Sequence, residues 1–124
     1  MITGIVDEFG RSLVPLLLQM NPAEAPIEIV VWIDTGFTGD LVLTISTVRQ
    51  LGLKLVSNVE ARLADGSISS YDVFVGWTTW FGISRKIEVI AGDSSVPLFG
   101  IGLLSGLRLT VDFASKEVKI EQPA

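Results

Sequence analysis

The sequence contains no cysteine and no histidine among its 124 residues. The first absence excludes disulfides and thiol nucleophiles, and the second excludes Ser-His triads and the usual zinc sites. Acid–base chemistry would therefore have to come from carboxylates, lysine or tyrosine. Basic residues are also scarce, because nine Lys and Arg stand against fourteen Asp and Glu, for a net charge of −5. Since phosphate binding needs a basic face, this balance disfavours a nucleic-acid partner.

Long hydrophobic runs are missing as well. No apolar stretch is long enough to span a bilayer, and the N-terminus lacks the basic and then apolar segments of a secretory signal. We therefore expect a soluble, cytoplasmic protein without membrane insertion. Hydrophobic residues still make up 48% of the chain, which is ample for a core and is consistent with some apolar surface covered by a partner. The length fits one domain over residues 1–124.

The chain is organised as many short apolar or alternating runs separated by turn residues. We expect a hairpin over residues 2–18 and further strands at 29–33, 41–43, 53–63, 68–81, 87–90, 96–104, 107–113 and 117–121. A single short helix is expected over residues 47–51, between Ser46 as the N-cap and Gly52 as the terminating glycine. This pattern predicts an all-β closed barrel or sandwich.

The most informative stretch is Asp34-Thr35-Gly36, which follows an apolar run over residues 29–33. That run has no polar alternation, so it predicts a strand buried on both faces. A carboxylate at the end of such a strand is held rigidly beside apolar surroundings. Gly36 allows a sharp turn and a close approach, and the Thr35 hydroxyl can lock the turn. The tripeptide is also a common way to end a strand, so its meaning depends on the rest of the chain.

Two further landmarks follow in order. Ala64-Asp65-Gly66 forms a turn of the Asp-Gly kind between two long strand patterns, which predicts a projecting β-hairpin. About thirty residues later, Leu98-Phe99-Gly100 belongs to an apolar strand that is interrupted by glycines.

The order of these three landmarks resembles that of the retropepsin-like aspartic proteases, most closely their small prokaryotic single-domain branch, over about residues 2–120. The resemblance implies an all-β closed barrel of the acid-protease fold, with one or two short helices and one lobe per chain. It also implies an aspartic endopeptidase that acts as a homodimer on an extended peptide or protein substrate, with no metal and no cofactor.

The resemblance further implies a role for each landmark. Asp34 of each protomer would meet its partner at the two-fold axis, where two close carboxylates hold one proton between them. Thr35 and Gly36 would support the catalytic loop, with Thr35 making hydrogen bonds across the dimer. The hairpin tip at Ala64, Asp65 and Gly66 would be a flap over the substrate. Leu98, Phe99 and Gly100 would lie under the loop, and Gly100 would pack where a side chain would collide.

Two other interpretations stay open at this point. A non-catalytic module of the same fold that binds peptides is suggested by Phe37, where many relatives carry Ala or Ser, and by Gly102, where relatives often carry a polar residue. The other is an unrelated β-barrel in which Asp34-Thr35-Gly36 is accidental.

Overall fold

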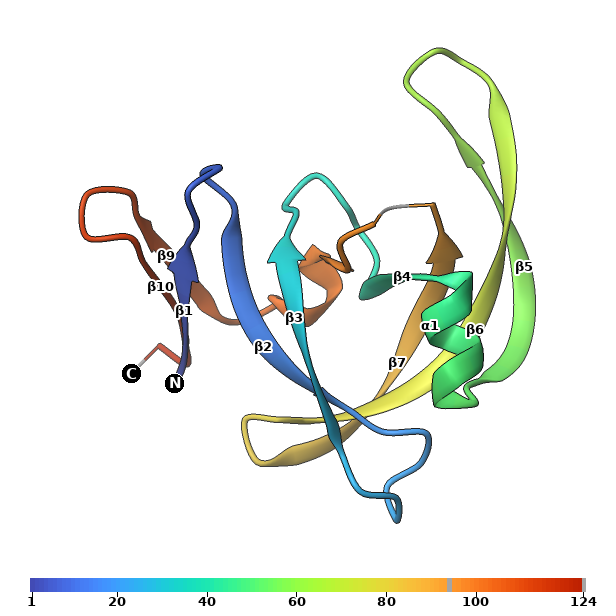
Figure 1. Ribbon diagram of the computed structural model, residues 1–124, viewed down its shortest axis with the longest axis horizontal. Helices are drawn as coiled ribbons and strands as arrows, with labels where there is room; N and C mark the ends of the chain where they lie inside the picture. Colours follow the sequence, from blue (N-terminus) through green and yellow to red (C-terminus); the bar gives the residue numbers. More distant parts are fainter. Residues whose placement is uncertain (94, 124) are drawn as a thin grey trace.

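The computed structural model describes residues 1–93 and 95–123, and strands account for most of that part of the chain (Figure 1). None of the helices described is long and apolar enough to cross a membrane. The elements, in chain order, are β1 (Ile2–Val6), β2 (Ser12–Leu18), β3 (Ile27–Ile33), β4 (Leu41–Thr44), α1 (Ile45–Leu51), β5 (Lys54–Arg62), β6 (Ile68–Trp80), β7 (Ile83–Gly92), β8 (Leu98–Phe99), the 3₁₀ turn η1 (Ile101–Leu103), β9 (Arg108–Asp112) and β10 (Glu117–Glu121).

All the described strands join one sheet in the order β5-β6-β7-β4-β8-β3-β2-β1-β10-β9. The all-β prediction is confirmed, but the prediction of a closed barrel is wrong, because β5 and β9 are edge strands that do not pair with each other. Closure by hydrogen bonding would require these two strands to meet. They instead lie at opposite sides of the molecule, with the β5–β6 hairpin reaching beyond the body (Figure 1).

The core is enclosed because the twisted sheet folds back on itself. Where β2 passes over β6, the Gln19 N–H donates to the Trp77 carbonyl at 2.7 Å and the Trp77 N–H donates back at 2.9 Å. The side chains packed inside are almost all aliphatic, with few aromatic rings, and the largest fully buried ones are Phe99, Leu16, Leu18, Leu41, Leu43, Ile87, Leu103 and Ile120. The packing of these apolar side chains therefore holds the folded-back sheet together, although its strands do not form a closed hydrogen-bonded barrel.

Strand β8 determines where the loop that follows β3 lies. It inserts between β3 and β4, pairing parallel with β3 through Trp32↔Leu98 and Ile33↔Phe99, and antiparallel with β4. Because β8 pairs with both β3 and β4, it fixes both ends of the loop that connects these two strands.

The prediction that β3 is buried on both faces holds for one face only. Val31 and Ile33 are buried in the core, whereas Val30 is 53% exposed and Trp32 is 37% exposed. The outward face of β3 therefore exposes the apolar side chains of Val30 and Trp32 in the single chain.

The short helix begins earlier than its sequence suggested. Thr44, not Ser46, is the N-cap, because its Oγ1 accepts the Thr47 N–H at 3.3 Å. Gly52 ends the helix in the left-handed region at φ 67°, as predicted.

Trp80 links the core to the turn η1. Its indole Nε1–H donates to the Leu103 carbonyl at 3.0 Å, and its ring lies 5.5 Å from that of Phe99. We expect Trp80→Phe to lower the free energy of unfolding by about 1–3 kcal/mol, because a buried carbonyl loses its donor. Urea unfolding measures this. Trp77→Phe, at a half-buried position on the same strand, is the control and is expected to change stability less.

Candidate active site

Asp34 lies at the end of β3 and is fixed by two backbone hydrogen bonds and one hydrogen bond to its side chain. Its N–H donates to the Phe99 carbonyl at 2.8 Å, and its carbonyl accepts the Phe37 N–H at 3.1 Å. The carboxylate Oδ1 accepts the Gly36 N–H at 3.0 Å. A half-buried carboxylate is thus held on the edge of a rigid sheet and oriented by its own loop.

A hollow of about 410 Å³ opens beside this carboxylate. Trp32, Ile33 and Leu98 give it apolar walls, and Asp34 and Thr35 give it its polar edge. Asp34 and Thr35 are therefore brought together with Leu98 of β8, which lies on the wall of the hollow. An apolar hollow next to one oriented carboxylate can hold a side chain while the carboxylate acts on a neighbouring bond or water.

The contact that braces Trp32 could not be predicted from any local motif. The Arg11 guanidinium carbon lies 5.7 Å from the centre of the Trp32 ring and 5.2 Å from that of Phe9. Arg11 Nε also donates to Asp7 Oδ2 at 2.7 Å. Burial alone would raise the pKa of Asp7, but hydrogen bonds from Arg11 and from the Phe9 N–H hold it below its usual value. The β1–β2 turn thus fixes one wall of the hollow.

Gly100 lies directly beneath the Asp34 loop. The Gly100 N–H donates to the Asp40 carbonyl at 2.9 Å, and the Ile101 N–H donates to the Phe37 carbonyl at 2.9 Å. A Cβ at Gly100 would run into the Gly39 carbonyl oxygen and would lie 2.6 Å from the Phe37 ring. The Phe37 ring thus lies against glycines below the loop and is not one of the residues that line the hollow.

Asp40 accounts for the glycine at position 102. A Cβ on Gly102 would collide with Asp40 Oδ1, while Asp40 Oδ2 accepts the Glu88 N–H at 3.0 Å. The Gly102 carbonyl accepts a hydrogen bond from Arg85 Nη2 at 2.8 Å. A carboxylate from the loop therefore takes the space that a side chain at position 102 would need. No local sequence signal could have shown this pairing.

The hairpin tip is placed away from the hollow. Ala64, Asp65 and Gly66 are exposed at the end of the projecting β5–β6 hairpin (Figure 1), and none of them lines the hollow beside Asp34. Gly66 has a φ of +86°, which favours glycine in this turn. A role for these residues over a substrate remains a prediction.

The order of the hairpin tip is expected to depend on pH through Asp65. Hydrogen bonds from the Ser67 hydroxyl at 2.6 Å and the Ser67 N–H at 2.9 Å hold the pKa of the Asp65 carboxyl below its usual value. A lowered pKa in the folded state adds stability that is present above the ordinary pKa and is lost as pH falls through the lowered one. In an NMR titration, the Ser67 amide should shift together with the Asp65 carboxyl, at a pH below the ordinary carboxyl range. A midpoint at or above the ordinary value would contradict these contacts.

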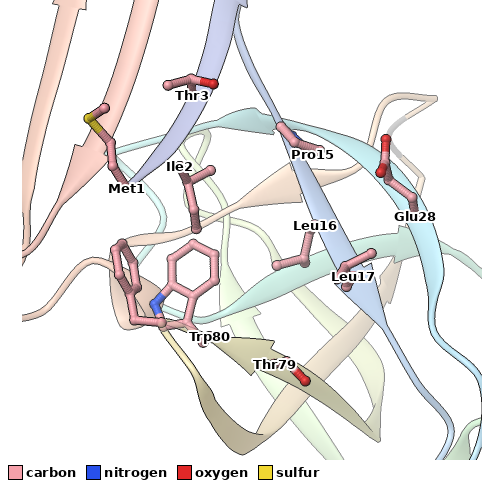
Figure 2. Close-up of a pocket in the computed structure, with 10 residues that line it drawn as sticks. Met1, Ile2, Thr3, Pro15, Leu16, Leu17, Glu28, Thr79 and Trp80 are labelled. Carbon is pink, nitrogen blue, oxygen red and sulfur yellow. The ribbon is translucent and has the colours of Figure 1, made fainter.

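Hollow size alone does not identify the site. A second hollow of about 410 Å³ lies at the other end of β2 and β3, against the β6–β7 turn (Figure 2), and it shares no lining residue with the first. The hollow beside Asp34 is the candidate active site because it joins an oriented carboxylate to an apolar wall.

Comparison with known proteins supports the fold. The chain matches the crystal structure of a retropepsin-like aspartic protease from Rickettsia conorii with a TM-score of 0.66 and 18% sequence identity, covering 97% of this chain and 89% of that one. No protein-family model matches this sequence, and no curated protein matches it either. This chain therefore has the fold of a retropepsin-like aspartic protease.

Proposed function

We propose that this protein is an aspartic endopeptidase in which two copies of the chain, each a single lobe, form one active site. The observation that carries the proposal is Asp34 itself. Its carboxylate is oriented by the Gly36 N–H at the end of a rigid strand, beside an apolar hollow. The fold, shared with a protein described as a retropepsin-like aspartic protease, supports this use of the carboxylate.

Two copies are needed because one carboxylate cannot be base and acid in the same step. Two-fold symmetry would bring Asp34 of one protomer next to that of its partner, where the pair would share one proton. The ionised member would take a proton from a water, which attacks the peptide carbonyl, and the protonated member would polarise that carbonyl. The apparent pKa values would belong to the pair.

The surrounding residues would position the substrate. An extended peptide would lie between the hairpin tip at 64–66 and the Asp34 loop, with one side chain in the hollow between Trp32 and Leu98. Thr35, which is exposed beside Asp34, would form hydrogen bonds across the dimer. Phe99 and Gly100 would support the loop from below.

The proposal is tested by incubating an unbiased peptide library with the wild type at pH 3–8 and identifying the cleaved bonds. We expect cleavage that is inhibited by pepstatin-like compounds and that prefers large apolar side chains next to the broken bond. A verified dimer that cleaves no peptide at any pH would contradict the proposal.

Thr35→Val is expected to weaken the dimer. A hydroxyl hydrogen bond contributes about 1 kcal/mol, and two-fold symmetry would remove it twice, so the dissociation constant should rise by about tenfold to thirtyfold. Sedimentation equilibrium measures the change. Thr38→Val, at an exposed position of the same loop, is the matched control. Equal dissociation constants for the wild type and Thr35→Val would remove the cross-dimer role.

The non-catalytic alternative was based on Phe37 and Gly102. Both residues now have a packing explanation, because the Phe37 ring lies against Gly100 and Asp40 occupies the space beside Gly102. Neither residue lines the hollow beside Asp34. A binding module would be favoured over an enzyme only if peptides bound to the wild type without turnover and bound equally well to Asp34→Ala.

A further inference from the structure

The hollow drawn in Figure 2 has no part in the proposed catalysis. It lies between β1, the middle of β2 and the β6–β7 turn, and it measures about 410 Å³. Its walls are mainly apolar, with Leu16, Leu17, Trp80 and Phe81 among them. Glu28 is the one ionisable side chain among the ten residues that line it.

Phe81 holds an unusual backbone conformation at the rim of this hollow. Its φ is +51°, and Gly82 follows at +80°, which makes a tight turn where Asn or Gly normally precedes the glycine. The Phe81 ring packs edge-on against Trp80, with ring centres 5.2 Å apart. A bulky residue kept in a strained conformation points to a use for its side chain at that place.

The hollow continues into the outward face of β2 and β3. In the register of the two strands, Leu17 lies beside Glu28, Pro15 beside Val30, and Leu13 beside Trp32. Leu17 is 40% exposed and Val30 is 53% exposed. From Glu28 to Trp32 this apolar face extends about 13 Å. A small ligand would fill the hollow and leave the face open, whereas a polypeptide segment can cover both.

We propose that the hollow and this face form a docking site for a polypeptide segment with a large apolar side chain next to a Lys or Arg. The apolar side chain enters the hollow between Leu17 and Phe81, and the basic group pairs with Glu28. Glu28 is exposed and has no ion pair within the described part of the chain. A lone carboxylate at the rim of an apolar hollow selects a cation over an anion. The hollow shares no lining residue with the one beside Asp34, so this docking does not depend on the proposed function, although the face ends at Trp32, which also lines the Asp34 hollow.

The test uses Asp34→Asn, so that cleavage cannot remove bound peptide. Phage that display random peptides of about twelve residues, long enough to cover the face, are selected on this variant, and one recovered peptide is synthesised with a fluorophore. Anisotropy then gives its affinity. We expect a large apolar residue close to Lys or Arg, and an affinity about tenfold lower in Glu28→Lys.

Two further variants locate the binding. Thr79→Arg puts a long side chain into the hollow from an exposed position and should also lower the affinity about tenfold. Glu24→Lys makes the same charge change at an exposed residue that does not line the hollow. This variant should bind the peptide with the same affinity as the protein that carries Asp34→Asn alone.

Several outcomes would overturn the proposal. These are recovered peptides without a basic residue, equal affinity in Glu28→Lys, or failure to recover any binding peptide. Binding of dodecylamine that depends on Glu28, without peptide binding, would assign the hollow to a small cationic amphiphile instead. Self-association of the protein that Glu28→Lys abolishes would assign the face to a second copy of this chain.

Discussion

Gly100→Ala is expected to destabilise the fold by about 3 kcal/mol or more, and Gly100→Val to prevent folding. The backbone at Gly100 has φ −96° and ψ 176°, which any residue adopts, so conformational strain is not the cause. The cause is the collision of a Cβ with the Gly39 carbonyl oxygen and the Phe37 ring. Both belong to the loop that carries Asp34, so relief would require that loop to move away from β8.

Urea unfolding of the alanine variant measures this effect. Gly66→Ala is the control, because nothing lies within 4 Å of its Cβ position while its φ of +86° imposes strain on alanine. That strain should cost about 1–2 kcal/mol. Comparing the two variants therefore separates the effect of backbone strain from the effect of a steric collision. If Gly100→Ala were as stable as the wild type, the close packing of β8 under the Asp34 loop would be contradicted.

Asp34→Asn is expected to lower kcat/KM by about 10⁴ while the melting temperature stays within a few degrees of the wild type. Asparagine keeps the shape of the side chain and an oxygen that can accept the Gly36 N–H, so the loop retains its hydrogen bond. It removes the group that ionises and exchanges a proton. Because both copies carry the change, both carboxylates of the proposed pair are lost.

The assay uses the best peptide from the library, with thermal unfolding in parallel. Asp112→Asn makes the same chemical change at the β9–β10 turn, where the carboxylate accepts the Ala114 and Ser115 N–H groups. It should retain full turnover. Turnover by a folded Asp34→Asn protein at the wild-type rate would remove Asp34 from the mechanism.

Much of the fold could be predicted because its signals are local. The Asp65-Gly66 turn, the glycine that ends α1 at position 52, and the apolar run before Asp34 each act within a few residues. The open sheet could not be predicted, because pairing between β5 and β9 depends on the path of the whole chain. The exposure of Val30 and Trp32 was missed for a related reason. An apolar strand sequence indicates that both faces of the strand are covered, but it does not show whether another part of the chain or a partner covers them.

Asp34 and Leu98 were both singled out in the sequence as parts of local motifs, and β8 brings them to one hollow. The contacts around them could not be predicted. The Arg11 contact with Trp32 depends on the register between β2 and β3, which no single stretch of sequence reveals. The fit between Asp40 and Gly102 likewise joins two segments that are distant in the chain.

The central claim is that two chains each supply one Asp34 to a single site. It is tested most directly by mixing wild type with Asp34→Asn in equal amounts in denaturant, refolding them together, and measuring turnover at constant total protein. If both carboxylates are required, only wild-type pairs are active, and turnover should fall to about one quarter of that of the unmixed wild type. A fall to about one half would mean that each chain acts alone, and would contradict the shared site.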